Sequence, residues 1–160
     1  MKHITLENGE VTGILTGSKT RITVLDTDLC VGDKVYAREP HWSYCTCIKS
    51  GFKYGKRRYQ LVPELGYKPI FIQPGNPADR ESGMPGWYRR QARCLEPDDA
   101  RLVFRVKNIR EMHLHDITMS DIKAEGHANL YVFQSFWRAK YGVKSWPSNP
   151  MIYVIEFDKL

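Results

Sequence analysis

Basic and aromatic side chains alternate in the middle of the chain. One run combines five cations with three aromatic rings: Lys49, Phe52, Lys53, Tyr54, Lys56, Arg57, Arg58 and Tyr59. A second, shorter cluster follows: Trp87, Tyr88, Arg89, Arg90 and Arg93. Cations contact phosphates and aromatic rings stack on bases, so this pattern is typical of surfaces that bind single-stranded nucleic acid. The expected nucleic-acid-binding residues are Lys53, Lys56, Arg57, Arg58, Arg89 and Arg90. A solvated insertion is the alternative, because charge runs commonly face water.

The four cysteines stand at positions 30, 45, 47 and 94. Cys45 and Cys47, with His41 upstream, could contribute to a zinc site. A structural zinc site takes four ligands, usually in C-x₂₋₄-C spacing, and one C-x-C pair lacks the second half. The N-terminus does not resemble a secretory signal, which disfavours a disulfide framework. The sequence therefore predicts reduced thiols, no metal and no cofactor.

Regular hydrophobic patterns on both sides of the basic, aromatic segment predict the helices and strands that hold the functional side chains in place. Helical spacing and stop signals predict helices over 6–17, 116–126 and 127–141, while β-branched or alternating runs predict strands over 20–25, 34–39, 44–48, 68–73, 102–109 and 151–157. The segment at about 41–93 is rich in Gly and Pro, which predicts a long, loop-rich insertion. Helices do not separate the strands one by one, so the pattern favours a small α+β barrel with two or three peripheral helices over a doubly wound sheet.

Length and charge narrow the class of protein. The 160 residues fit a single domain, 1–160, and 42% hydrophobic content is typical of a globular chain. Twenty-four Lys and Arg against eighteen Asp and Glu give a net charge of +6, which favours a polyanionic partner. There is no apolar run long enough to cross a bilayer. These features predict a cytoplasmic protein that does not enter a membrane.

Four segments resemble, in order, the ASCH domains of the PUA-like superfamily. Residues 13–20, GILTGSKT, resemble the opening I-L-x-G-x-K-T of these domains. Residues 32–39, GDKVYARE, resemble the strand G-D-x-L-W-V-R-E of ASCH proteins common in bacteriophage genomes. Residues 116–118 and 124–126 resemble the helix D-I-x…A-x-A-E-G, and residues 149–157, NPMIYVIEF, are similar to the closing strand N-P-W-V-x-V-I-E-F. The segment 42–93 matches only loosely.

The resemblance implies a small β-barrel with a cleft for a nucleoside or RNA, in a phage-infected bacterial host. Some small ASCH proteins resemble N4-acetylcytidine amidohydrolases. Their functional set is the Lys of a K-T-x-T motif, its second Thr, and a Glu in the following helix. Carried over, these positions are Lys19, Ile22 and Glu125, and Ile22 has no hydroxyl. A non-catalytic RNA- or modified-base-binding module and a ribonuclease using Lys19 with nearby hydroxyls are the alternatives.

Strand alternation suggests a hydroxyl to replace the missing one. If residues 19–23 form a regular strand, Lys19, Arg21 and Thr23 share a face. Thr23 would then meet the Lys19 amine, whose neutral form burial favours. Glu125 would pass a proton to the leaving amine or orient water, and we expect it within reach of Lys19 at a polar cleft. Thr20, on the opposite face, is the fallback. The expected substrate-binding residues are Arg21, Arg38 and Glu39. The alternative is a strand of ordinary surface Lys and Thr.

Overall fold

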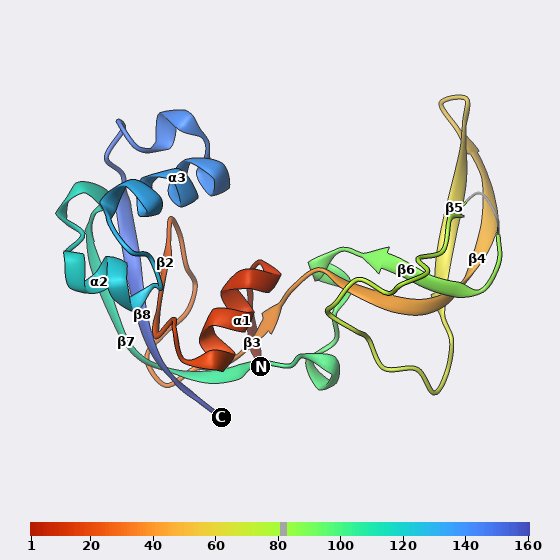
Figure 1. Cartoon of the computed structure of the whole chain (residues 1–160), viewed down its shortest axis with the longest axis horizontal. Coiled ribbons are helices and arrows are strands. Elements are labelled where there is room, and N and C mark those ends of the chain that lie inside the picture. The colour runs from red at the N-terminus through yellow and green to blue at the C-terminus, as the bar shows by residue number, and fades with distance from the viewer. Residues whose placement is uncertain (81–82) are drawn as a thin grey trace. The chain divides into compact units, whose positions relative to one another are not determined.

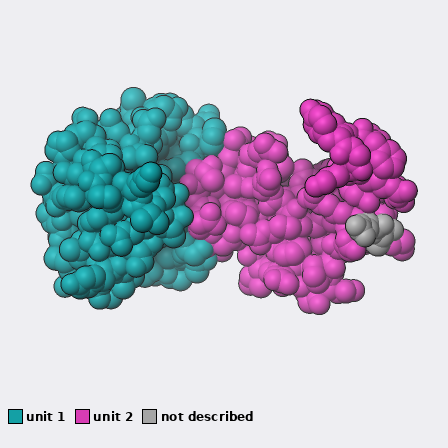
Figure 2. Space-filling model, turned by 90° about the horizontal axis from the view of Figure 1, so that it is seen from above, with its two compact units in different colours: residues 1–4, 9–37, 102–160 teal, residues 5–8, 38–101 magenta. Residues whose placement is uncertain are grey.

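The computed structural model of the chain describes residues 1–80 and 83–160. It divides into two units, shown in Figure 2: unit 1 comprises residues 1–4, 9–37 and 102–160, and unit 2 comprises residues 5–8 and 38–101. Unit 2 nearly coincides with the insertion expected at about 41–93. None of the described helices is long and apolar enough to cross a membrane.

The sheet of unit 1 has five strands in the order β1-β3-β7-β8-β2, with β7 and β8 near its middle (Figure 1). Their bounds are Lys2–Thr5 for β1, Lys34–Arg38 for β3, Val103–His113 for β7, Met151–Lys159 for β8 and Arg21–Val24 for β2. The pairs β3·β7, β7·β8 and β8·β2 are antiparallel. Within the described residues the short strands β1 and β2 end the sheet without pairing to each other. The α+β class is confirmed, but the sheet does not close into the expected barrel.

Three α-helices accompany this sheet in the described part of the chain: α1 (Asn8–Thr16), α2 (Met119–Ala124) and α3 (Leu130–Tyr141). A capping box begins α2, because Thr118 Oγ1 accepts a hydrogen bond from the Asp121 N–H and the Asp121 carboxylate accepts one from the Thr118 N–H. Phe133 and Trp137 of α3, one helical turn apart, are fully buried with residues of β8. Leu130, at the start of the helix, is 38% exposed.

Unit 2 holds a three-stranded antiparallel sheet in the order β5-β4-β6, with bounds Lys56–Pro63, His41–Lys53 and Gly86–Arg90. It differs from the loop-rich insertion that the sequence predicted. The strand expected over 68–73 is absent, and Ile70 forms only an isolated bridge with Trp42. Strands β4 and β5 form a hairpin whose two turn residues, Tyr54 and Gly55, both have positive φ, the geometry that fits strand twist in two-residue turns.

Candidate functional site

The loop between α1 and β2 places Lys19 beside the C-terminal end of α2. The Lys19 N–H donates to the Gly13 carbonyl (3.0 Å), and the Thr20 N–H donates to the Ala124 carbonyl (2.7 Å). Strand β2 therefore begins at Arg21, and Lys19 and Thr20 precede it. The regular strand expected from Lys19 to Thr23 was wrong in this respect, because the backbone at Lys19 and Thr20 bonds to helix residues and not to β8.

Two glycines permit this close approach of loop and helix. At Gly126, which has φ +86°, an added Cβ would lie 3.2 Å from the Ser18 carbonyl oxygen. At Gly13 an added Cβ would lie 3.3 Å from the Lys19 Cβ. Gly126 thus combines a backbone conformation that L-residues rarely adopt with a close contact that a side chain would crowd.

Lys19 belongs to a chain of four charges joined by ion pairs, here named the buried charge cluster: Glu125, Lys19, Glu10 and Lys140. The Lys19 Nζ lies 3.2 Å from Glu10 Oε1 and 3.4 Å from Glu125 Oε1. The Lys140 Nζ lies 3.2 Å from the same Glu10 oxygen. Lys19 is 4% exposed, so its charge is removed from water and depends on these two carboxylates. The expected proximity of Lys19 and Glu125 is confirmed.

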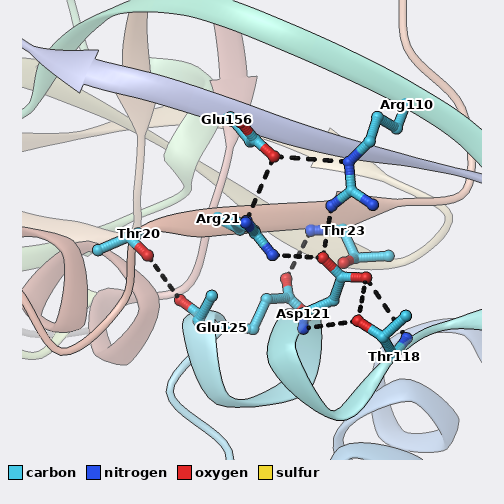
Figure 3. Close-up of polar contacts among 9 residues, drawn as sticks. Thr20, Arg21, Thr23, Arg110, Thr118, Asp121, Glu125 and Glu156 are labelled. Atoms are coloured by element: carbon cyan, nitrogen blue, oxygen red, sulfur yellow. Dashed lines mark hydrogen bonds and ion pairs between the residues drawn. The ribbon is translucent and has the colours of Figure 1, made fainter.

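Thr23 joins this cluster through its backbone. Its N–H donates to Glu125 Oε1 over 2.5 Å, and Figure 3 shows Glu125 directed at this strand from α2. Within the described residues, three buried side-chain atoms here have no hydrogen-bond partner: Thr23 Oγ1, Glu125 Oε2 and His127 Nε2. Native proteins rarely leave such atoms unpaired, and those that remain so commonly meet water or a ligand or serve in catalysis.

The environment changes the proton affinity of two of these groups. Burial raises the pKa of Glu125 above its ordinary value, against the opposing effects of the Lys19 charge and of the Thr23 N–H. Burial also lowers the pKa of His127, and the positive charge of Lys19 adds to this shift. A carboxyl group with a raised pKa exchanges protons closer to neutral pH, as general acid–base catalysis requires.

A pocket of about 350 Å³ lies beside the cluster, lined by Ile14, Gly17, Lys19, Thr20, Phe157, Asp158 and Lys159. Lys19 therefore borders a concave surface as well as the buried charges. Thr20 is exposed, and its hydroxyl donates to the Ala124 carbonyl over 3.4 Å. Of the two threonines that the sequence nominated, Thr23 contacts Glu125 through its N–H, whereas Thr20 bonds through its N–H and its hydroxyl to the Ala124 carbonyl of α2.

Arg21, expected to contact substrate, instead ties β2 to α2 and β8. Both Arg21 and Arg110 place a guanidinium nitrogen 2.5 Å from Asp121 Oδ1, and both reach Glu156 Oε1, at 3.4 and 3.5 Å (Figure 3). Burial acts to raise the pKa of Asp121, but hydrogen bonds from Arg110 and Thr118 outweigh it and lower that pKa. This network joins the start of α2 to the sheet.

Arg38 and Glu39, the other expected substrate-binding residues, belong to unit 2, whereas the buried charge cluster belongs to unit 1. Glu39 is fully buried and receives two hydrogen bonds of 2.7 Å from Arg101. The Arg101 guanidinium also lies 4.9 Å from the ring centre of Phe71. Glu39 therefore has a structural partner inside unit 2, in the bidentate geometry that makes carboxylate–arginine pairs strong.

The β4–β5 hairpin carries the expected nucleic-acid-binding residues at its tip: Lys53, Lys56, Arg57 and Arg58. The Arg57 guanidinium lies 5.7 Å from the ring centre of Phe52, and the Lys53 ammonium lies 5.3 Å from that of Tyr54. Phe52 is 71% exposed and Tyr54 90%. We name this tip, residues 52–58, the basic hairpin; it offers cations and open ring faces together.

The remaining expected nucleic-acid-binding residues lie on β6. The Arg89 guanidinium lies 5.7 Å from the ring centre of Trp42. Arg90 is held more firmly, because its Nη1 donates to the Leu61 carbonyl over 3.2 Å and approaches the Cys45 thiol at 3.8 Å. Arg90 therefore combines a structural role at the sheet with a charge that faces a pocket.

Sequence reasoning missed Glu10, Lys140 and His127. Glu10 lies on α1 and Lys140 on α3, and no local pattern links them to Lys19.

All four cysteines are free, and Cys45 and Cys47 are buried together in the core of unit 2. No group of three His, Cys, Asp or Glu side chains in residues 1–80 and 83–160 is placed to hold a metal.

No family model, curated protein or solved structure matches this chain. The roles of the residues therefore rest on their chemistry and geometry.

Proposed function

We propose that unit 1 is an ASCH-type, PUA-like domain that hydrolyses an N-acyl amide on a nucleobase, with N4-acylated cytidine as the substrate class. One observation carries the proposal: a single buried oxygen, Glu125 Oε1, contacts both the Lys19 ammonium and the Thr23 N–H. The four segments that resemble ASCH domains fall on the α1–β2 loop, β3, α2 and β8, which supports the same assignment.

In this proposal Glu125 handles the proton and Thr23 provides the nucleophile. The Thr23 hydroxyl attacks the acyl carbon and passes its proton to Glu125 Oε2, the oxygen that has no partner among the described residues. The bond between the acyl carbon and the exocyclic nitrogen breaks, and Glu125 delivers the proton to the leaving amine. Water then hydrolyses the threonine ester, releasing the carboxylic acid and restoring the hydroxyl. Lys19 orients the Glu125 carboxylate.

The position of Thr23 compensates for the isoleucine that replaces the threonine of the amidohydrolase motif. Ile22 is fully buried and pairs with Ile155 of β8, so it serves the core. Thr23, one residue later, contacts Glu125. A threonine thus reaches the carboxylate through its backbone N–H, although the motif position itself is apolar.

The direct test incubates the purified protein with N4-acetylcytidine and separates the products by chromatography. Release of cytidine and acetate in equal amounts supports the proposal. Cleavage of an RNA strand without deacetylation would instead favour the ribonuclease alternative, and binding of the nucleoside without turnover would favour the binding module.

A second function is favoured by a separate observation on unit 2. In the basic hairpin, cations lie over the strongly exposed rings of Phe52 and Tyr54. Cations that contact phosphates beside rings that stack on bases are how proteins hold single strands without sequence preference. We propose that the basic hairpin binds single-stranded RNA, with the salt dependence described below as its test.

A further inference from the structure

Four arginines surround two adjoining pockets of unit 2. The first, of about 340 Å³, is lined by Tyr59, Gln60, Leu61, Arg80, Arg89, Arg90, Gln91, Arg93 and Cys94. The second, of about 430 Å³, shares four of these residues: Arg80, Arg89, Arg90 and Gln91. We name the two together the arginine pocket. Its size and its concentration of one charge distinguish it from the basic hairpin, which is an exposed ribbon.

The arginines of the pocket lack close ion pairs within the described part of the chain. None of Arg80, Arg89, Arg90 and Arg93 forms an ion pair with a described carboxylate, whereas Arg21, Arg101 and Arg110 all do. The neighbouring His41 has a lowered pKa, mainly because it is buried; the charges of Arg90 and Arg89 add to this shift, while a hydrogen bond with the Glu39 backbone and the charge of Asp99 oppose it.

The pocket also has a fixed part and adjustable parts. Arg90 is anchored by its hydrogen bond to the Leu61 carbonyl, and its strand neighbour Arg89 lies over Trp42. Arg80 and Arg93 are exposed and can adjust to a ligand. Arginine presents a planar fork of N–H donors that matches phosphate oxygens, and a doubly charged ligand would relieve the repulsion among four cations.

We propose that the arginine pocket binds a phosphomonoester dianion, supplied either by a free nucleoside monophosphate or by the terminal phosphate of a strand. The inference goes beyond amide hydrolysis in unit 1 and involves other residues. It also differs from strand binding by the basic hairpin, because it requires a terminal phosphate and no polymer.

The test measures binding by titration calorimetry with cytidine 5′-monophosphate and cytidine as the matched pair of probes. We expect the monophosphate to bind at least about tenfold more tightly, since its extra contacts are charge-assisted hydrogen bonds. The double variant Arg89→Gln/Arg93→Gln should remove this preference, and Arg57→Gln/Arg58→Gln in the basic hairpin should keep it. Equal binding of both probes, or the same loss in both double variants, would overturn the proposal.

A second pair of probes separates the two sources of the phosphate. A short RNA with a 5′-phosphate is compared with the same RNA bearing a 5′-hydroxyl. Tighter binding of the phosphorylated strand, lost in Arg89→Gln/Arg93→Gln, assigns the pocket to strand ends. Equal binding of the two strands, with the monophosphate preference retained, assigns it to free nucleotides. Because Arg89 and Arg93 are exposed, both substitutions should leave the melting temperature nearly unchanged.

Discussion

Glu125 Oε1 lies 3.4 Å from the Lys19 Nζ, a contact between residues 106 positions apart in the chain. The same oxygen accepts a hydrogen bond from the Thr23 N–H, while the second oxygen of Glu125 has no partner among the described residues. One oxygen of the carboxylate is thus held in place, and the other is buried without a hydrogen-bond partner among the described residues. This division is what a group needs if it is to be positioned by the protein and still exchange protons.

The pairing of Lys19 makes a strong prediction about stability. Lys19→Met should lower the free energy of unfolding by about 3–5 kcal/mol, because it leaves Glu10 and Glu125 buried without a shared counter-charge. Lys123→Met on the exposed side of α2 is the control and should change it by less than about 0.5 kcal/mol. Adding Glu125→Gln to Lys19→Met should recover part of the loss in urea denaturation. Equal effects of the two lysine substitutions would show that the ion pairs contribute nothing.

The raised pKa of Glu125 predicts a pH dependence with a definite sign. The folded protein keeps the Glu125 proton to a higher pH than the unfolded chain, in which the pKa of a glutamate is 4.5. As the pH rises above 4.5 and through the raised pKa, the unfolded state binds fewer protons than the folded state. The free energy of unfolding therefore falls over this range. Urea denaturation of wild type and Glu125→Gln over this range should show wild type losing stability relative to the variant. A constant difference between the two proteins contradicts the raised pKa.

Asp121 should contribute through both its helix cap and its two arginines. Asp121→Ala removes the capping box and the contacts of Arg21 and Arg110, which should cost about 2–4 kcal/mol. Asp158→Ala is the matched control, since its pair with Lys107 is exposed and 3.8 Å long; it should cost at most about 0.5 kcal/mol. Thermal unfolding of the two variants measures the difference. Similar losses of stability in both would show that the contacts of Asp121 contribute no more than an exposed ion pair.

The basic hairpin should produce salt-dependent binding of a single strand. In anisotropy measurements with a labelled RNA, the logarithm of the binding constant should fall linearly with the logarithm of the salt concentration, with a slope of about −0.7 per phosphate contact. Arg57→Ala/Arg58→Ala should make this slope shallower by the amount that about one to two phosphate contacts contribute. The rate of hydrolysis of a free nucleoside should stay unchanged, because a nucleoside has no phosphate. Lys107→Ala/Lys123→Ala in unit 1 serves as the charge-matched control. If wild-type protein binds no RNA even at low ionic strength, the hairpin is a solvated ribbon.

Local patterns predicted the elements that bury one face. The helical spacing of Phe133 and Trp137 and the apolar run of β8 correspond to elements of the core. Strand β5 was missed because it is exposed on most of both faces, so it carries no alternation of polar and apolar residues. Gly55 in its turn was a usable signal, because two-residue hairpin turns need positive φ at the second turn position and glycine adopts it readily.

The site was predictable only in part, for a similar reason. Lys19 and Glu125 were nominated by resemblance, and their proximity arises from a loop packed on the end of α2. Alternation along a strand could not describe Lys19, because that residue precedes β2. Glu10 and Lys140 complete the charge balance from α1 and α3, and such tertiary contacts leave no trace in local sequence.

The most direct test of the central claim is the rate of cytidine release from N4-acetylcytidine by wild type, Thr23→Val and Thr20→Val. Valine keeps the shape of threonine and its backbone N–H, so Thr23→Val retains the hydrogen bond to Glu125 and should fold, which its melting temperature checks. We predict that Thr23→Val reduces kcat by about 100-fold or more and that Thr20→Val stays within about twofold of wild type. Failure of the wild-type protein to release cytidine, or wild-type turnover by a folded Thr23→Val, would contradict the assignment of Thr23 as the nucleophile of an amide-hydrolysing site.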